Sequence, residues 1–189
     1  MCGRYYIEDD APFLSESPKH VSGEIFPAQA APVIANSRLL KPRMFLLRWG
    51  YSLGKKTIIN ARSEGAAQSS LFSDGIKRRR CIVPASFYFE WHSKTKVKYS
   101  FGDARGNTLY MAGVYRLTEA GGEYAVLTRS AGSEISDIHP RMPVLLSREL
   151  SAEWLNLSSD PIEIMRAGRI ELAVREAEDE FIRCGDIRP

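Results

Sequence analysis

Short apolar segments separated by clusters of Gly, Pro, Asn and Asp dominate the chain. Segments of this kind, rich in β-branched and aromatic residues, are typical of β-strands. We predict strands in APVIA (31–35), MFLLRWG (44–50), TIINA (57–61), RCIVPASFYFEW (80–91), TLYMAGVYRL (108–117), EYAVLTRS (123–130) and MPVLL (142–146). The pattern therefore predicts a β-rich core.

Two polar segments have the composition of hairpin turns, DARGN (103–107) and TEAGGE (118–123), so we expect consecutive antiparallel strands around each. Few helices are expected: one around AAQSSLFSDG (66–75), one in SRELSAEWLNL (147–157) and one in DPIEIMRAG (160–168). The last segment carries Asp160 as a helix N-cap, Pro161 at the first helical position and Gly168 as a stop signal. No repeat, linker or low-complexity stretch divides the chain, so we expect one domain over residues 1–189.

The composition changes this picture little. With 44% hydrophobic and 26% charged residues, the chain has the balance of a folded globular protein and not that of a disordered one. It has neither an apolar leader nor a stretch near the ~18 apolar residues of a membrane span, which predicts a cytoplasmic protein without membrane contact. Cys2, Cys81 and Cys184 are scattered and form no CxxC pair, so we expect no disulfide framework, metal or cofactor.

The charge is mildly basic. A net charge of +3 and a pI near 8.8 permit nucleic acid as a partner without requiring it. The basic run at 77–80 (KRRR) is typical of a solvated face.

The position of Cys2 suggests chemistry. Removal of Met1 is expected when a small residue follows it, and it would leave Cys2 with a free α-amine and a thiol two carbons apart. Such a residue offers two nucleophiles. The alternative is that a cysteine stands at this position by chance.

Two polar residues stand within or beside apolar segments. Asn60 follows an apolar run, and this position favours a turn in which the Asn60 side-chain amide binds its own backbone. If the strand instead continues, Arg62 would lie on the same face of the strand as Asn60. Glu90 stands among aromatic residues, where burial would raise its pKa toward that of a general acid at neutral pH. The alternative for Glu90 is an exposed strand position beside a basic residue.

Three further residues are candidates with ordinary alternatives. His139 precedes a proline, which favours an extended backbone, and it could act as a proton shuttle or be a surface residue. Trp49 and Trp91 are either core aromatics or platforms on which unpaired bases stack.

The order of these residues resembles that of the SRAP family, the SOS response-associated peptidase-like proteins that attach covalently to abasic sites in single-stranded DNA. The resemblance rests on MCGRY, FPAQAAPVI, LRWG, INARSE, RRRCIVPASFYFEW, YMAGVY, VLTRSA and IHPRMPVLL, and it extends to about Leu146. The chain departs from the family in lacking a glycine before FYFEW and in having only the short YSLGKK segment after LRWG. The resemblance implies a mixed α+β fold around a curved, barrel-like antiparallel sheet with a few short helices and a basic groove.

The resemblance also implies the functional residues. The catalytic set is Cys2, Asn60, Glu90 and His139, and the DNA-binding set is Arg4, Arg62 and Arg141 with Trp49 and Trp91 near the strand. It implies a thiazolidine crosslink between Cys2 and the ring-opened deoxyribose, with strand cleavage at the abasic site as a side activity. Met1 is removed either autocatalytically, as the family name suggests, or by the cell's aminopeptidase. We expect a monomer, associated with the nucleoid if the source is bacterial. The alternatives are an N-terminal cysteine hydrolase of small amides and a nucleic-acid-binding module without catalysis.

Overall fold

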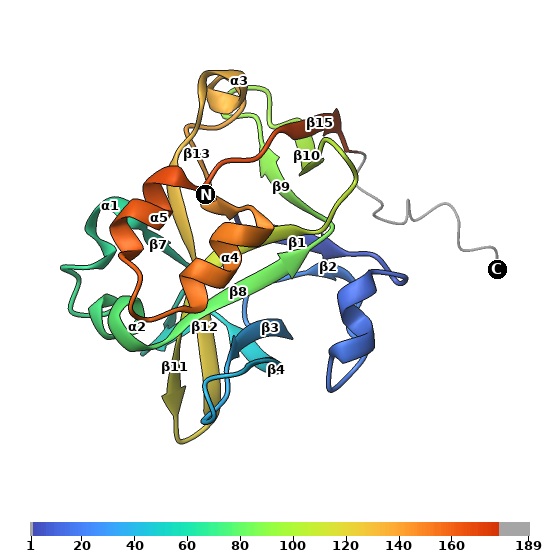
Figure 1. Ribbon diagram of the computed structural model, residues 1–189. Coiled ribbons are helices and arrows are strands. Elements are labelled where there is room, and N and C mark those ends of the chain that lie inside the picture. The colour runs from blue at the N-terminus through green and yellow to red at the C-terminus, as the bar shows by residue number, and fades with distance from the viewer. Residues whose placement is uncertain (1, 178–189) are drawn as a thin grey trace.

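A closed ring of five strands forms the centre of the computed structural model, which describes residues 2–177 (Figure 1). The ring strands are β3 (Ala30–Asn36), β4 (Pro42–Trp49), β8 (Arg80–Ala85), β11 (Leu109–Thr118) and β12 (Gly121–Ser130). Because β12 pairs with both β4 and β11, the order β12-β4-β3-β8-β11 closes on itself. The short strands β7 (Asn60–Arg62) and β13 (Arg141–Pro143) extend the sheet beside β12, and β14 (Leu145–Leu146) extends it beside β11.

The expected mixed α+β fold with a curved, barrel-like sheet is confirmed, with one difference in strand direction. Most pairs are antiparallel, but β12 runs parallel to both β4 and β7. These parallel pairs bring the start of β7 beside the middle of β12, with Asn60 opposite Val126.

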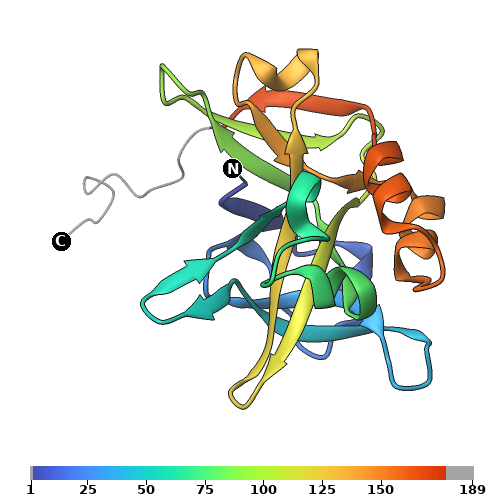
Figure 2. The same cartoon turned by 90° about the vertical axis from the view of Figure 1, so that its left-hand side faces the viewer.

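A second sheet of five strands lies against the barrel. Its strands, in spatial order, are β15 (Leu172–Glu176), β10 (Lys98–Asp103), β9 (Phe87–Trp91), β1 (Arg4–Ile7) and β2 (Gly23–Ile25). The segment 80–91, predicted as one run, is therefore two strands that separate at Ser86 and enter different sheets. The segment 57–61 also divides, because β6 (Lys56–Ile58) pairs only with β5 (Tyr51–Leu53), and this hairpin projects from the barrel in Figure 2.

One of the two hairpin predictions was wrong. Thr118 pairs with Gly121 in the β11–β12 hairpin, as expected for the segment 118–123. The segment 103–107 instead connects the two sheets, because β10 pairs with β9 and β15 while β11 pairs with β8, β12 and β14. The segment still forms a turn, in which the Asp103 side chain accepts hydrogen bonds from the backbone amides of Arg105 and Asn107.

The helices are short and surround the barrel (Figure 1). They are the 3₁₀ helix η1 (Pro12–Glu16), α1 (Ser63–Ala66), α2 (Ser73–Arg78), α3 (Ser133–Ser136), α4 (Arg148–Leu155) and α5 (Pro161–Ala167). The last two were predicted, and the Asp160 side chain caps α5 by accepting a hydrogen bond from the backbone of Ile162. The helix expected at 66–75 was wrong, because that segment lies mostly between α1 and α2.

Two clusters of buried side chains use opposite faces of the barrel strands. Along β8, Cys81 and Val83 enter a cluster shared with the second sheet, while Ile82 enters a cluster shared with α2, α4 and α5. This alternation follows from the two-residue period of a strand. Because both faces of β8 pack against other elements, every residue of the strand is buried.

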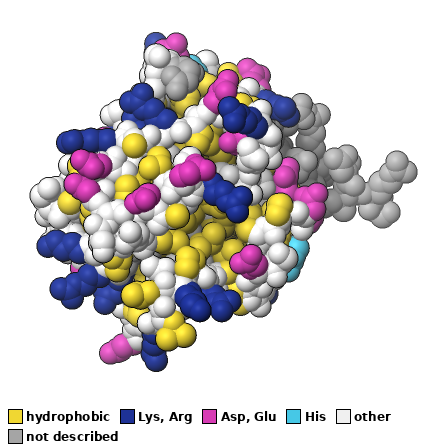
Figure 3. All heavy atoms as spheres, in the orientation of Figure 1, with side chains coloured by type: hydrophobic (Ala, Val, Ile, Leu, Met, Phe, Trp, Pro, Cys, Tyr) yellow, Lys and Arg dark blue, Asp and Glu magenta, His cyan; other side chains and the backbone are white. Residues whose placement is uncertain are grey.

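The basic run before β8 is only partly a solvated face. Lys77 and Arg78 are exposed, and the face drawn in Figure 3 mixes basic and acidic side chains around an apolar hollow. Arg80, in contrast, is 4% exposed and donates hydrogen bonds to the carbonyl oxygens of Ile76 and Ser159. The prediction for Arg80 was wrong because its guanidinium binds carbonyl oxygens at the ends of helices.

Met1 and residues 178–189, including Cys184, lie outside the described residues, so the domain prediction over residues 1–189 stays a prediction. Within residues 2–177, no helix is long and apolar enough to cross a membrane.

Candidate active site

Cys2 and Asn60 meet although they are far apart in the sequence. Cys2 lies two residues before the start of β1, and Asn60 is the first residue of β7. The Asn60 Nδ2 donates a hydrogen bond of 2.7 Å to the Cys2 carbonyl oxygen. The Asn60 Oδ1 is buried and has no hydrogen-bond partner among the described residues. The local turn expected for Asn60 is therefore replaced by a contact that fixes the backbone at Cys2.

Glu90 and His139 form a second contact at the same place. Arg4 of β1 pairs with Phe89 of β9, so Glu90 lies beside the residues that precede β1. Glu90 is 3% exposed, which rules out the exposed alternative. The His139 Nδ1 lies 3.6 Å from the Glu90 Oε1.

The backbone of Arg141 orients the imidazole. The His139 Nδ1 lies 3.1 Å from the Arg141 amide nitrogen and 2.9 Å from its carbonyl oxygen. Depending on the tautomer, Nδ1 accepts from the amide or donates to the carbonyl. Either arrangement holds the ring beside Glu90.

Burial controls the protonation of the three titratable groups. It raises the pKa of the Glu90 carboxyl to about 7. Burial and the charge of Glu90 together raise the pKa of the Cys2 thiol well above its usual value, and burial lowers the pKa of His139. At neutral pH, Glu90 therefore populates both its acid and its carboxylate form, while His139 is neutral and the thiol keeps its proton.

The predicted DNA-binding arginines have different surroundings. Arg62 is exposed at the end of β7 and forms no ion pair within residues 2–177. The Arg141 guanidinium is bound by both oxygens of Glu64, at 2.6 and 3.0 Å, and by the Thr128 carbonyl oxygen at 2.6 Å. The Arg141 hydrogen bond lowers the pKa of the Glu64 carboxyl to about 2.

Arg4 belongs to a cluster of cations and aromatic rings. Its guanidinium lies 5.2 Å from the ring centre of Trp91 and 3.1 Å from a carboxylate oxygen of Glu24. Glu24 also pairs with the Lys98 ammonium at 3.3 Å, and that ammonium lies 4.1 Å from the ring centre of Phe89. Trp91 is half-buried, so part of its surface remains available to a ligand.

Trp49 is a core residue, so its predicted place beside DNA was wrong. Its side chain is fully buried between Tyr5 and Tyr124, and its Nε1 donates to the Ile59 carbonyl oxygen. Gly50 follows with φ of 107°, a backbone conformation that favours glycine. The LRWG motif thus turns the chain while the indole anchors the segment that leads to β7.

Sequence reasoning missed three charged residues at the site: Glu24, Glu64 and Lys98. Glu64 follows Arg62 within the quoted INARSE segment, which was the one available signal. Glu24 and Lys98 gave no such signal, because their proximity depends on the pairing of β1 with β2 and β9 and on the pairing of β9 with β10.

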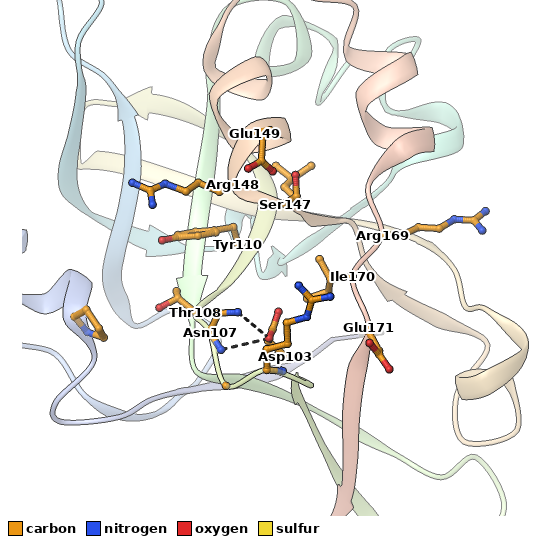
Figure 4. A pocket seen from close by; sticks show the side chains of 14 residues that line it. Asp103, Asn107, Thr108, Tyr110, Ser147, Arg148, Glu149, Arg169, Ile170 and Glu171 are labelled. Atoms are coloured by element: carbon orange, nitrogen blue, oxygen red, sulfur yellow. Dashed lines mark hydrogen bonds between the residues drawn. The ribbon is translucent and has the colours of Figure 1, made fainter.

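A separate cavity of about 820 Å³ lies between the 103–108 segment and the start of α4 (Figure 4). Tyr110 and Arg148 are among its lining side chains, and Asn107 is bound to Asp103 at its edge. None of the predicted catalytic residues lines this cavity. Within residues 2–177, no group of three His, Cys, Asp or Glu side chains is arranged to hold a metal ion.

Comparisons with known proteins identify the family of the chain. The family model described as SOS response associated peptidase (SRAP) matches residues 1–178. The Bacillus subtilis protein named abasic site processing protein YobE is 33% identical over 188 residues, which cover 85% of this chain and 85% of that protein. Abasic site processing protein YoqW of the same species is 31% identical and covers 85% and 83%.

Solved structures show a similar fold. The crystal structure of a phage-related protein from Bordetella bronchiseptica has a TM-score of 0.76 at 22% identity, covering 93% of this chain and 94% of that one. A protein from Bacteroides thetaiotaomicron has a TM-score of 0.74 at 21% identity, with coverage of 96% and 91%. At these identities, the likeness concerns the fold.

Proposed function

The chain belongs to the SOS response-associated peptidase family, and we propose that it processes abasic sites by forming a covalent crosslink through Cys2. An abasic deoxyribose opens to an aldehyde, whose carbon is an electrophile. The α-amine that Cys2 gains when Met1 is removed is the matching nucleophile, since such amines have a pKa near 7.7–8.0 and are partly neutral at physiological pH. The raised pKa of the thiol favours the amine as the group that attacks first.

The reaction proceeds in two stages. The amine nitrogen bonds to the aldehyde carbon while its proton passes to the oxygen, giving a carbinolamine. Glu90 in its acid form donates a proton to the departing hydroxyl, which leaves as water and gives the protonated imine and the Glu90 carboxylate. The Cys2 sulfur then bonds to the imine carbon, the electron pair of the C=N bond passes to the nitrogen, and the thiol proton returns to the Glu90 carboxylate as the thiazolidine ring closes. Closure is intramolecular, so the thiol needs no lowered pKa.

Asn60 and His139 position the reacting groups. The Asn60 Nδ2 fixes the Cys2 carbonyl, and the buried Asn60 Oδ1, which has no partner among the described residues, would accept a hydrogen bond from the Cys2 α-amine. Neutral His139 beside Glu90 assists the opening of the deoxyribose ring. Before Met1 is removed, the α-nitrogen of Cys2 belongs to a peptide bond and is no nucleophile, so we expect no reaction.

Single-stranded DNA is the proposed substrate because the reacting sugar must leave the base stack to reach a buried site. Exposed Arg62 and the Arg141 guanidinium would bind the phosphates that flank the abasic sugar. Half-buried Trp91, beside Arg4, would stack against a neighbouring base.

The convergence of Cys2, Asn60 and Glu90 on one buried position carries this proposal. Intact mass spectrometry tests it with a single-stranded oligonucleotide that contains one abasic aldehyde. We expect the purified protein to lack Met1 and to gain the mass of the oligonucleotide less one water. An oligonucleotide with a tetrahydrofuran site, which has no aldehyde, is the control and should give no adduct.

A form of the protein with an uncleaved residue ahead of Cys2 separates this proposal from its alternatives. It should keep its circular dichroism spectrum and form no adduct. A normal adduct from this form would exclude the α-amine mechanism. Hydrolysis of small amides without any DNA adduct would indicate an N-terminal cysteine hydrolase, and reversible binding alone would indicate a binding module.

A further inference from the structure

The Arg141 guanidinium, proposed above to bind a phosphate, already holds an anion of its own chain. Both carboxylate oxygens of Glu64 face its terminal nitrogens, at 2.6 and 3.0 Å. A carboxylate and a phosphodiester present the same pair of oxygens to a guanidinium. Glu64 therefore occupies the position that a phosphate of the strand would take.

The two partners are anchored to different degrees. The Arg141 side chain is 15% exposed and is also held by the Thr128 carbonyl oxygen at 2.6 Å, across the β12–β13 pair. The Glu64 side chain is 53% exposed and belongs to the four-residue helix α1. Because the Glu64 carboxylate reaches solvent, it can turn away when a phosphodiester replaces it on the guanidinium, which stays bound to the Thr128 carbonyl oxygen.

We propose that Glu64 is an affinity-determining residue, whose carboxylate occupies the Arg141 guanidinium in the free protein and is displaced by a phosphodiester of the incoming strand. This inference rests on the proposed function. The ionised carboxylate both competes for Arg141 and repels a phosphate, so it lowers the affinity of the site for DNA.

The other predicted DNA-binding arginines do not share this arrangement. Arg62 has no carboxylate partner within residues 2–177. The partner of Arg4 is Glu24, whose side chain is 21% exposed and is also bound by Lys98. Glu24 would have to leave two cations to release Arg4, which singles out Glu64 as the displaceable anion.

A second interpretation of the same contacts predicts the opposite result. The Arg141 backbone contacts the His139 Nδ1, so Glu64 could serve only to hold Arg141 and thereby His139. Loss of the Glu64 charge would then slow crosslinking and leave DNA affinity unchanged.

Glu64→Gln tests the proposal, because it keeps the shape of the side chain and removes its charge. Equilibrium binding is measured with a single-stranded oligonucleotide that carries a tetrahydrofuran site, which cannot react, over a series of salt concentrations. We expect the dissociation constant to fall several-fold at low salt and the log–log salt dependence to steepen by up to about one unit. The crosslinking rate at saturating aldehyde-bearing strand is measured alongside, because a slower rate with unchanged affinity is the result that the second interpretation predicts.

Asp74→Asn is the matched control, because Asp74 has the same exposed fraction of 53%, also pairs with an arginine and lies in α2. It makes the same change in net charge and should leave binding nearly unchanged. Glu64→Asp keeps the charge but shortens the reach to Arg141, so it should give an intermediate affinity. This variant also serves if Glu64→Gln does not fold.

The outcomes are distinct. Tighter binding by Glu64→Gln and not by Asp74→Asn supports the proposal. Unchanged or weaker binding overturns it, as does equal tightening by both variants, which would reflect net charge alone. If the wild-type protein neither binds the strand nor forms an adduct, the proposed function itself fails.

Discussion

The centre of the candidate site and its rim are built in different ways. At the centre, buried Cys2 and Glu90 are fixed through strand pairing and through the Asn60 hydrogen bond to a backbone carbonyl. At the rim, Arg4 and Arg141 are held by carboxylates that remain partly exposed. Burial changes the pKa of the central groups, whereas the rim keeps its charges in contact with solvent.

This difference separates chemistry from binding. Substitutions at the centre should change reaction rates with little effect on affinity, and substitutions at the rim should change affinity and its salt dependence with little effect on rates. Each prediction below tests one side of that division.

The largest effect is expected for Cys2→Ser. The variant keeps the α-amine but exchanges the thiol for a hydroxyl, a much weaker nucleophile toward an imine, so the reaction should stop at the Schiff base. We expect loss of the heat-stable crosslink, cleavage of the strand at the abasic site by β-elimination, and an adduct that is stable only after borohydride treatment. A heat-stable crosslink at the wild-type level would show that the thiol takes no part.

Glu90→Gln should slow imine formation by roughly a hundredfold to ten-thousandfold, the usual contribution of a general acid. The wild-type rate should rise as the α-amine loses its proton and fall as Glu90 loses its own above about pH 7, giving a bell-shaped profile. The variant should keep the rising limb and lose the falling one. The measurement is the single-turnover crosslinking rate against pH.

Affinity for the tetrahydrofuran oligonucleotide is the control for this variant. The affinity should change less than the rate does, because the Glu90 carboxyl is buried. A loss of affinity as large as the loss of rate would contradict the division between centre and rim.

The sequence predicted much of the barrel but not the junction that makes the site. Periodicity located β3, β4, β8, β11 and β12, because their apolar runs are long. It could not show that the chain leaves the barrel at Ser86, since β8 and β9 read as one apolar run. That change of sheet places Glu90 beside the N-terminal segment.

The residue types in the sequence predicted the central groups of the site better than they predicted the residues of its rim. An acid among aromatics at Glu90 indicated burial, and burial alone accounts for its raised pKa. The same logic could not decide that Trp49 is fully buried while Trp91 is only half-buried, because both end apolar strands. Carboxylates such as Glu64 were missed because an ion pair between distant residues leaves no local pattern.

Arg62→Ala should have a moderate effect confined to binding. Removal of one phosphate contact should weaken binding to single-stranded DNA at low salt and reduce the log–log salt dependence by up to about one unit. Arg105→Ala is the control, because Arg105 is exposed and lines the separate cavity of Figure 4. Equal effects of the two substitutions would mean that net charge, not a rim contact, controls affinity.

The smallest effect concerns the stability of the fold. The pKa of Glu90 is about 7 in the folded protein and near its ordinary value of 4.5 in the unfolded chain, so the folded state binds the proton more tightly. Its contribution to the free energy of unfolding is complete below about pH 4.5 and is lost as the pH rises through about 7. The loss is at most about 3 kcal/mol, because each pKa unit corresponds to about 1.4 kcal/mol.

Glu90→Gln cannot ionise and should escape this loss. Its free energy of unfolding relative to the wild type should therefore increase between pH 5 and pH 8, as measured by denaturant unfolding at both values. For Glu64 the pH dependence of stability has the opposite sign. Its lowered pKa stabilises the fold at neutral pH, and that stabilisation is lost in acid. A difference between Glu90→Gln and the wild type that stays constant with pH would mean that burial does not raise the Glu90 pKa, and the general-acid role would lose its physical basis.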